Sequence, residues 1–196
     1  MDVDLRVMTE DLDRACRDSG LRQAAFAAAL GTSASRFSTY RSGRTVPSAT
    51  FYLRARRIGS ALKQASDHGW MTPPMSAAAI ASALAEPDEI WAFKLALQAR
   101  DHLRELLTDR PEISSAWEAA PQSTGRTEWD AFLAALAEHE FDLAGQPTPA
   151  WTQRAALTAD WILDSPMFDE MGVRAHTPSW LAQRRIYVSA RDLTTV

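Results

Sequence analysis

Apolar residues recur at intervals of three and four along most of the chain, which is the period of an α-helix. The first stripe comprises Leu5, Met8, Leu12, Ala15 and Cys16, and it ends before Ser19-Gly20. Similar patterns predict further helices at residues 22–30, 33–42, 48–58, 75–85, 86–109, 111–119, 127–143 and 148–163. The sequence therefore predicts an all-α fold, and it leaves open whether Gly59 ends the fourth helix.

Two of these helices carry long apolar stripes, which we expect to form the core of the second half. The helix at 127–143 has Trp129, Phe132, Leu133, Leu136 and Phe141. The helix at 86–109 would have Pro87 in its first turn, and its stripe is Ile90, Phe93, Leu97, Leu103, Leu106 and Leu107. The last thirty residues lack such a period, so they are expected to be irregular apart from a β-prone piece at 186–188.

Residues 67–74 interrupt the helical pattern with Gly69, Pro73 and Pro74, and we interpret this segment as a boundary between domains. The expected organisation is a five-helix N-terminal domain at residues 1–68 and a linker at 69–74. A C-terminal helical domain with an irregular tail would follow at 75–196.

Composition adds an uneven distribution of charge to this picture. Apolar residues make up 46% and charged residues 23% of the 196 residues, which excludes disordered and collagen-like classes. The net charge is −4, yet residues 20–66 contain eight basic residues and no acidic one, whereas residues 69–196 contain ten basic and eighteen acidic residues. Such asymmetry suggests a nucleic-acid-binding part joined to a part with another role.

Cys16 is the only cysteine, so an intrachain disulfide and a multi-cysteine zinc site are both impossible. We expect Cys16 to be a small buried residue of the first helix. The acidic amino terminus lacks the pattern of a secretory signal, and no apolar run approaches the length of a membrane span. These features predict a cytoplasmic protein that does not bind a membrane.

Residues 20–43, GLRQAAFAAALGTSASRFSTYRSG, followed by Val46-Pro47-Ser48, closely resemble the helix-turn-helix of phage-repressor-like (Xre-type) regulators. Gly31 suits the left-handed turn that ends the first helix of such a pair. Ser33 suits the N-cap of the second helix. The two helices would approach at Ala27, and apolar contacts would come from Phe26, Leu30, Phe37 and Tyr40.

In such motifs the N-terminal end of the second helix enters the major groove of double-stranded DNA. The resemblance implies base reading by Ala34, Ser35, Arg36 and Thr39, with Arg36 donating two hydrogen bonds to a guanine. It implies phosphate contacts from Arg22, Gln23, Ser33, Arg41 and Arg44. Regulators of this kind act as homodimers on inverted repeats, and the fourth helix and the helix at 86–109 are candidate dimer seams. Arg54, Arg56 and Arg57 cannot all face DNA.

All seven tryptophans follow this motif, and they would serve either as core residues or as a surface that grips a partner. Trp151, Leu157 and Trp161 together with residues 177–189, TPSWLAQRRIYVS, resemble the tail of a group of helix-turn-helix proteins encoded beside nucleotidyltransferase-like toxins, in which the regulator is the antitoxin. The resemblance implies that this tail binds a toxin protein. The residues that would make the contacts are Trp151, Trp161, Trp180, Arg184, Arg185 and Tyr187.

Enzymatic patterns are weak in this chain. The four histidines lack metal-ligand spacing, and there is neither a glycine-rich phosphate loop nor a nucleophile elbow, so we expect no catalysis, metal or cofactor. His102 and His139 are expected to form surface pairs with acidic neighbours, and Glu138 and Glu140 to be solvated. The leading hypothesis is a sequence-specific DNA-binding transcriptional repressor that acts as an antitoxin. It would autoregulate its operon and neutralise a partner toxin through its C-terminal part. The alternative is a free-standing repressor whose C-terminal domain senses a small ligand.

Overall fold

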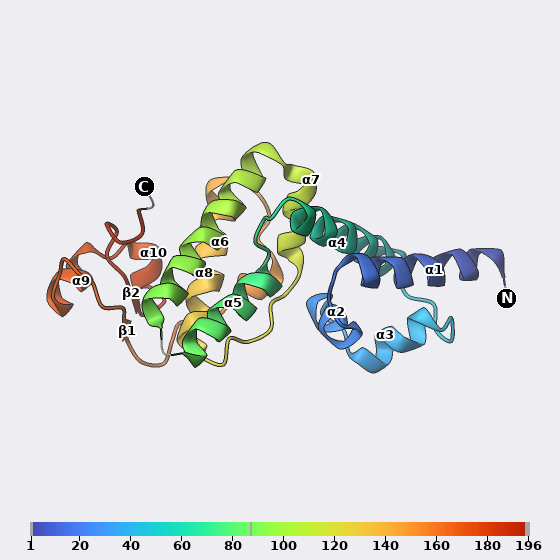
Figure 1. Ribbon diagram of the computed structural model, residues 1–196, viewed down its shortest axis with the longest axis horizontal. Coiled ribbons are helices and arrows are strands. Elements are labelled where there is room, and N and C mark those ends of the chain that lie inside the picture. Colours follow the sequence, from blue (N-terminus) through green and yellow to red (C-terminus); the bar gives the residue numbers. More distant parts are fainter. Residues whose placement is uncertain (1, 87, 195–196) are drawn as a thin grey trace. The chain divides into compact units, whose positions relative to one another are not determined.

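The fold is almost entirely helical, as the periodicity predicts. The structure is a computed structural model and describes residues 2–86 and 88–194 (Figure 1). Within these residues the only strands form one two-stranded sheet. The chain divides into two compact units, of which the first consists of the residues up to Ala78 together with His102–Gln122. The second consists of Ala79–Asp101 together with the residues from Ser123 onward.

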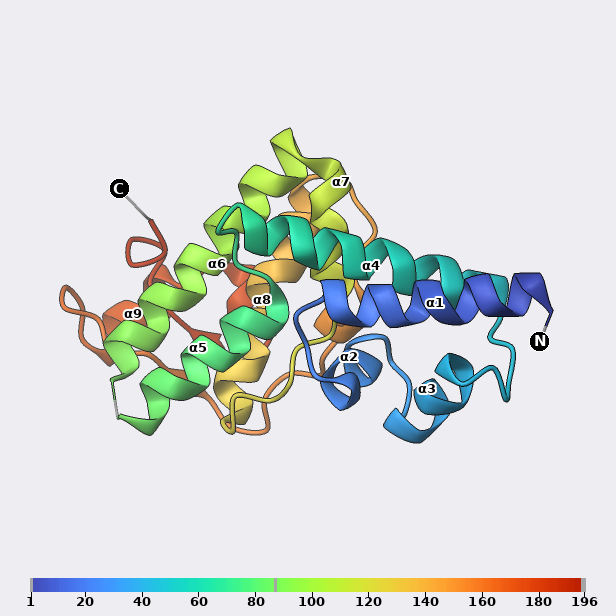
Figure 2. The same cartoon turned by 45° about the vertical axis from the view of Figure 1, so that its right-hand side comes forward.

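The first unit is built around two long helices that lie side by side, α1 (Val3–Asp18) and α4 (Ala49–Asp67), with the short helices α2 (Gln23–Ala29) and α3 (Ala34–Arg41) between them in sequence (Figures 1 and 2). The outer side of α4 packs against α7 (Pro111–Ser114) and the 3-10 helix η1 (Ser115–Glu118). Short polar caps begin α3 and α4, where the hydroxyls of Ser33 and Ser48 accept hydrogen bonds from backbone amides, as predicted.

Gly59 does not end α4, because the helix continues through it to Asp67. The reason for a glycine is the crossing with α1: a Cβ atom added at Gly59 would lie 2.5 Å from the carbonyl oxygen of Ala15. The missing side chain therefore lets the two backbones approach closely at this point. Cys16 is buried beside the same crossing, as expected, and this burial raises the pKa of its thiol.

The two units do not follow the expected division at residues 69–74. Met71, Thr72 and Pro73 are buried, and α5 (Pro73–Ala85) already begins at Pro73. Proline is tolerated in the first turn of a helix, where its missing amide has no intrahelical partner, so the Pro-Pro pair begins an element here instead of separating two domains. The chain then returns to the first unit at His102–Gln122, which no local pattern indicates.

The second unit has α8 (Thr127–Leu143) at its core. The predicted stripe on α8 is confirmed, since all five of its apolar residues are buried, and Phe132 stacks on Phe93 of α6 (Glu89–Asp109) with ring centroids 5.9 Å apart. The predicted stripe on α6 is confirmed at Leu97, and also at Leu103 and Leu106, which lie in the part of α6 that belongs to the first unit. It is wrong at Ile90, whose exposed fraction is 73%. The prediction about Pro87 lies outside the described residues.

The predicted helix at 148–163 is wrong. The segment contains only the short 3-10 helix η2 (Ala150–Thr152), and it then runs without helix, through a bend at residues 158–159, into strand β1 (Trp161–Ile162). Its backbone pairs with the tail instead of with itself: the amide of Leu157 donates to Arg184, that of Trp161 to Arg185 and that of Leu163 to Tyr187. Contacts that are distant in sequence therefore override the helical spacing of the apolar residues.

The tail is more ordered than its sequence suggests. The β-prone piece forms β2 (Ile186–Tyr187), which is parallel to β1 with Trp161 opposite Ile186. Two short helices, α9 (Glu170–His176) and α10 (Ser179–Ala182), were not predicted. Across the described residues, no helix is both long enough and apolar enough to cross a membrane.

Candidate nucleic-acid interface

The turn between α2 and α3 is closed by backbone hydrogen bonds. At the end of α2, the amide of Gly31 donates a hydrogen bond to the carbonyl oxygen of Ala28, and the amide of Thr32 donates one to the carbonyl oxygen of Ala27. Both hydrogen bonds are 2.9 Å long. This pattern requires a left-handed residue, and Gly31 has φ of +71°. The hydroxyl of Ser33 then accepts a hydrogen bond from the amide of Arg36 at 3.1 Å, which starts α3. The predicted roles of Gly31 and Ser33 in the backbone are confirmed.

An aromatic cluster holds the two short helices at a fixed angle. The residues expected at their contact are all buried, namely Phe26, Ala27, Leu30, Phe37 and Tyr40. Phe26 meets Phe37 edge to face, with ring centroids 5.6 Å apart. Phe51 of α4 adds contacts to Phe37 and Tyr40 that the sequence did not indicate, because Phe51 belongs to a different helical stripe. One face of α3 is therefore fixed in the core.

The opposite face of α3 is open to solvent. Ala34, Ser35 and Arg36 are exposed, so three of the four residues expected to read bases share one accessible surface. Thr39 is only partly exposed, and its hydroxyl donates to the carbonyl oxygen of Arg36 at 2.7 Å. The hydroxyl hydrogen of Thr39 is therefore used inside the helix.

The residues expected to contact phosphate fall into two groups. Arg22 and Arg44 are exposed on either side of α3 in the sequence. Arg41 instead donates hydrogen bonds to the carboxylate of Asp13 and to the side-chain oxygen of Gln23. These contacts tie α3 to α1 and α2, so the positive charge of Arg41 is compensated inside the unit. Ser33 is engaged as the cap of α3.

Carboxylates from other parts of the first unit compensate most of the remaining positive charge. Arg57 pairs with Glu118 of η1, with a second guanidinium contact of 2.8 Å, and Arg54 lies 3.9 Å from the same carboxylate. Arg56 pairs with Asp11, and Lys63 pairs with Asp67. In the part of the chain that the structure describes, Arg22, Arg36 and Arg44 are the cations of residues 20–66 that have no carboxylate partner. We will call these three the open arginines.

The residues proposed to contact a partner in the tail are mostly engaged within the second unit. Trp161 packs edge to face against Trp129, with ring centroids 5.1 Å apart, and Trp180 stacks on His139 at 4.1 Å. Arg184 pairs with Glu138, and Arg185 pairs with Asp160 at 2.7 Å. The ring of Tyr187 lies under Arg174, and Trp151 is partly buried. Trp161, Trp180 and Arg184 thus attach the C-terminal segment to α8, whereas Arg185 and Tyr187 contact residues of that segment itself. Contact of any of them with a partner stays a prediction.

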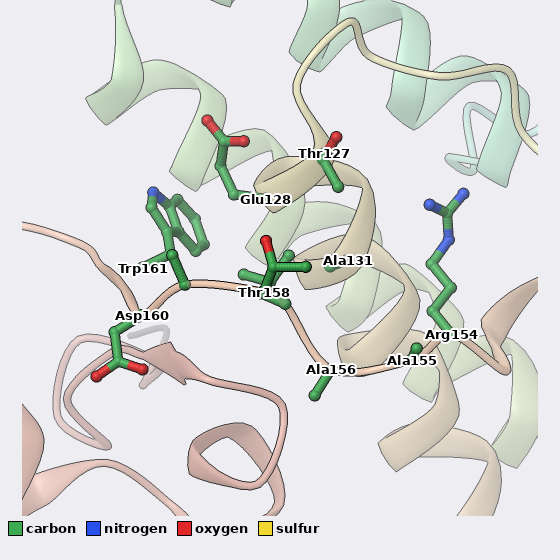
Figure 3. Close-up of a pocket in the computed structure, with 11 residues that line it drawn as sticks. Thr127, Glu128, Ala131, Arg154, Ala155, Ala156, Thr158, Asp160 and Trp161 are labelled. Atoms are coloured by element: carbon green, nitrogen blue, oxygen red, sulfur yellow. The ribbon is translucent and has the colours of Figure 1, made fainter.

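A pocket of about 600 Å³ lies between the start of α8 and the extended segment at 154–161 (Figure 3). Figure 3 shows Glu128 and Trp161 on one side of it and Arg154 on the other. Its charged groups already have partners, since Glu128 pairs with Arg126 and Arg154 lies 3.9 Å from Asp130. Asp160 is bonded to Arg174 and Arg185, which hold the pKa of its carboxyl below the ordinary value. The pocket therefore offers little unpaired charge to a ligand.

Two expectations about polar residues need correction. Glu140 is 3% exposed and so is buried instead of solvated. His102 is partly buried, accepts a hydrogen bond from the amide of Met71 at 2.9 Å, and lies against Trp70. His139 is likewise partly buried under Trp180. Both histidines are therefore less exposed than expected, and their pairing with acidic neighbours stays a prediction.

Comparisons with protein-family models, with curated proteins and with solved structures found no match to this chain.

Proposed function

We propose that the first unit binds double-stranded DNA through the exposed face of α3, and that the chain is a sequence-specific transcriptional regulator. The observation that carries this proposal is the distribution of uncompensated charge. Five of the eight cations in residues 20–66 pair with carboxylates of the same unit. Of the three open arginines, Arg36 belongs to α3, Arg44 follows it and Arg22 is the N-cap residue of α2. A surface that attracts phosphate needs positive charge of this kind.

The roles within this surface follow from the geometry of α3. The buried side of the helix, with Phe37 and Tyr40, fixes its orientation, so the N-terminal end can enter a major groove without a change in the fold. Arg36 is the base-reading residue because its guanidinium can donate two hydrogen bonds to the O6 and N7 atoms of guanine. Arg22 and Arg44 bind the phosphates that border the groove, which positions α3 without specifying sequence.

Two further elements belong to this proposal. A single helix covers few base pairs, so we propose that two copies bind an inverted repeat whose half-sites are about one helical turn apart. Repression follows when this site overlaps a promoter. The antitoxin role is a narrower hypothesis, and coexpression with the product of the adjacent gene tests it: a complex that relieves toxicity would support it, and neither complex nor relief would remove it.

Three variants that each lose one positive charge test the DNA-binding proposal. The full chain is first used to select duplexes from a randomised library, and affinity for the selected duplex is then measured by fluorescence anisotropy. Arg36→Ala should weaken binding by about 1–3 kcal/mol and relax the preference at one base position. Arg44→Ala should weaken binding to all duplexes alike. It should also lower the slope of log affinity against log salt concentration by about one unit.

Arg57→Ala is the matched control, because it removes the same charge from the same basic segment at a residue that is paired with Glu118. It should leave DNA affinity nearly unchanged. Equal losses for Arg36→Ala and Arg57→Ala would show that net charge alone attracts DNA, and would refute the assignment of α3. If the selection yields no duplex and no binding is measured at low salt, DNA binding itself is refuted.

A further inference from the structure

An apolar groove lies in the second unit, between the first turns of α6 and the loop that follows β1. Its volume is about 490 Å³, and its apolar walls are formed by Ile90, Phe93, Leu163 and Pro166. Phe93 stacks on the buried Phe132, which anchors the floor of the groove to the core. The groove is separate from the pocket of Figure 3, with which it shares no lining residue.

Large apolar side chains are exposed in this groove and at residues that directly follow its lining residues in the sequence. Ile90 is 73% exposed and Trp91, beside it on α6, is 51% exposed. Met167, the residue after Pro166, is 57% exposed. Exposed apolar groups that gather around a groove mark binding surfaces, and tryptophan and methionine are typical of those that hold protein partners.

The surrounding backbone holds the groove open in a defined shape. The carboxylate of Asp88 accepts a hydrogen bond from the amide of Trp91 at 2.8 Å and so caps α6. On the other wall, Leu163 is held by a hydrogen bond to Tyr187. The buried Arg100 donates to the carbonyl oxygen of Leu193 at 2.6 Å, which fastens the tail next to Asp192. A groove with fixed walls loses little entropy when it is filled.

The charge of the rim indicates what fills it. Asp164 and Asp192 line the groove, and within the described chain neither side chain has an ion-pair partner. Glu89 lines it as well, and its contact with Arg126 is a long one of 3.4 Å. Lys94 is the one cation among the lining residues. A mainly acidic rim around an apolar floor complements a segment that is apolar on one side and basic on the other.

We propose that this groove binds a basic amphipathic helix of a partner protein, with the apolar face of the helix against Ile90, Trp91 and Phe93 and its basic side chains facing Asp164 and Asp192. A helix of this kind covers the exposed tryptophan, which a small molecule inside the groove would leave in water because Trp91 does not line it. The proposal concerns the second unit alone and does not depend on DNA binding by the first.

The test uses the full chain and two labelled synthetic helices. One helix has leucine on one face and lysine on the other, and its matched counterpart has glutamate in place of every lysine. Anisotropy titrations at low salt should give saturable binding of the lysine helix with Kd below about 100 μM, and binding of the glutamate helix at least about tenfold weaker. Added salt should weaken binding of the lysine helix.

Substitutions at exposed positions then locate the binding. Ile90→Ser and Trp91→Ala should each weaken the affinity for the lysine helix at least about fivefold, because they remove apolar contact area. The double variant Asp164→Asn with Asp192→Asn should abolish the preference for lysine over glutamate. Leu143→Ser is the matched control: Leu143 is 68% exposed, does not line the groove, and lies about 16 Å along α8 from Phe132, on which Phe93 stacks, so its loss should change nothing.

Three results would overturn the proposal. They are the absence of saturable binding, equal binding of the lysine and glutamate helices, and unchanged binding by Ile90→Ser. If Ile90→Ser instead converts a dimer of the chain to a monomer in sedimentation experiments, the groove is an interface between copies and the partner helix is excluded. Ile90→Ser should leave DNA affinity unaltered, so a failure here is distinguishable from a failure of the DNA-binding proposal.

Discussion

Replacing Gly59 by alanine should destabilise the first unit, although helix propensity alone predicts the opposite. Alanine favours a helix over glycine by up to about 1 kcal/mol. At Gly59, however, the added Cβ would lie 2.5 Å from the carbonyl oxygen of Ala15 and 2.9 Å from its Cα atom. Both atoms belong to the backbone of α1, so no side-chain rotation can relieve the contact.

The size of the expected loss in stability follows from how far α1 and α4 must separate. Restoring ordinary contact requires a separation of α1 and α4 by roughly 1 Å, and a gap of that size forfeits about a quarter to a half of the dispersion energy of each contact that it opens. The affected interface includes the buried Leu12, Ile58 and Leu62. Overpacking of this kind costs about 1–3 kcal/mol. After a gain in propensity of about 1 kcal/mol is subtracted, we expect Gly59→Ala to lower the free energy of unfolding by up to about 2 kcal/mol.

Urea unfolding followed by far-ultraviolet circular dichroism measures this change as a shift of the transition midpoint at constant slope. Ser60→Ala is the control, because Ser60 is the next residue of α4 and is exposed. It gains helix propensity without meeting α1, so its stability should equal or slightly exceed that of the natural chain. If Gly59→Ala is as stable as Ser60→Ala, the close crossing of α1 and α4 is refuted.

Other groups give three further predictions. Arg174 and Arg185 lower the pKa of Asp160, so its carboxylate stabilises the fold above the unfolded pKa of about 4, and this contribution is lost as the pH falls through the lower folded pKa. Asp160→Asn should therefore flatten the acid side of stability measured against pH, and an unchanged profile would contradict the pairing. Because burial raises the pKa of the Cys16 thiol, a thiol reagent should modify the native chain far more slowly than the urea-unfolded chain, and equal rates would show that Cys16 is accessible. Glu118→Gln removes the carboxylate partner of Arg57. Because both side chains are partly exposed, the free energy of unfolding measured in urea should fall by less than about 1 kcal/mol. A larger fall would mean that this pair is better shielded from solvent than its exposure indicates.

Much of the candidate interface was predictable because its signals are local. Gly31 and Ser33 act through hydrogen bonds to residues within five positions, and the apolar residues of α2 and α3 meet across one short turn. The exposure of Arg36 follows from the same helical period that buries Phe37 and Tyr40. The pairing of Arg41 with Asp13 was not predictable, because these residues are 28 positions apart and nothing in either segment points to the other.

The sequence by itself determined the helical class, most helix boundaries, and the turn between α2 and α3, since periodicity, caps and glycine act over a few residues. Only the tertiary structure decided which of the seven arginines among these cations keep uncompensated charge, because the carboxylate partners of the paired ones come from α1 and η1. It also decided that residues 154–163 are extended and that Ile90 faces solvent, since both depend on segments that the chain brings together from a distance. Local pattern thus specifies most of the helices up to Leu143, whereas the electrostatic and apolar surfaces available to partners arise only when the elements pack.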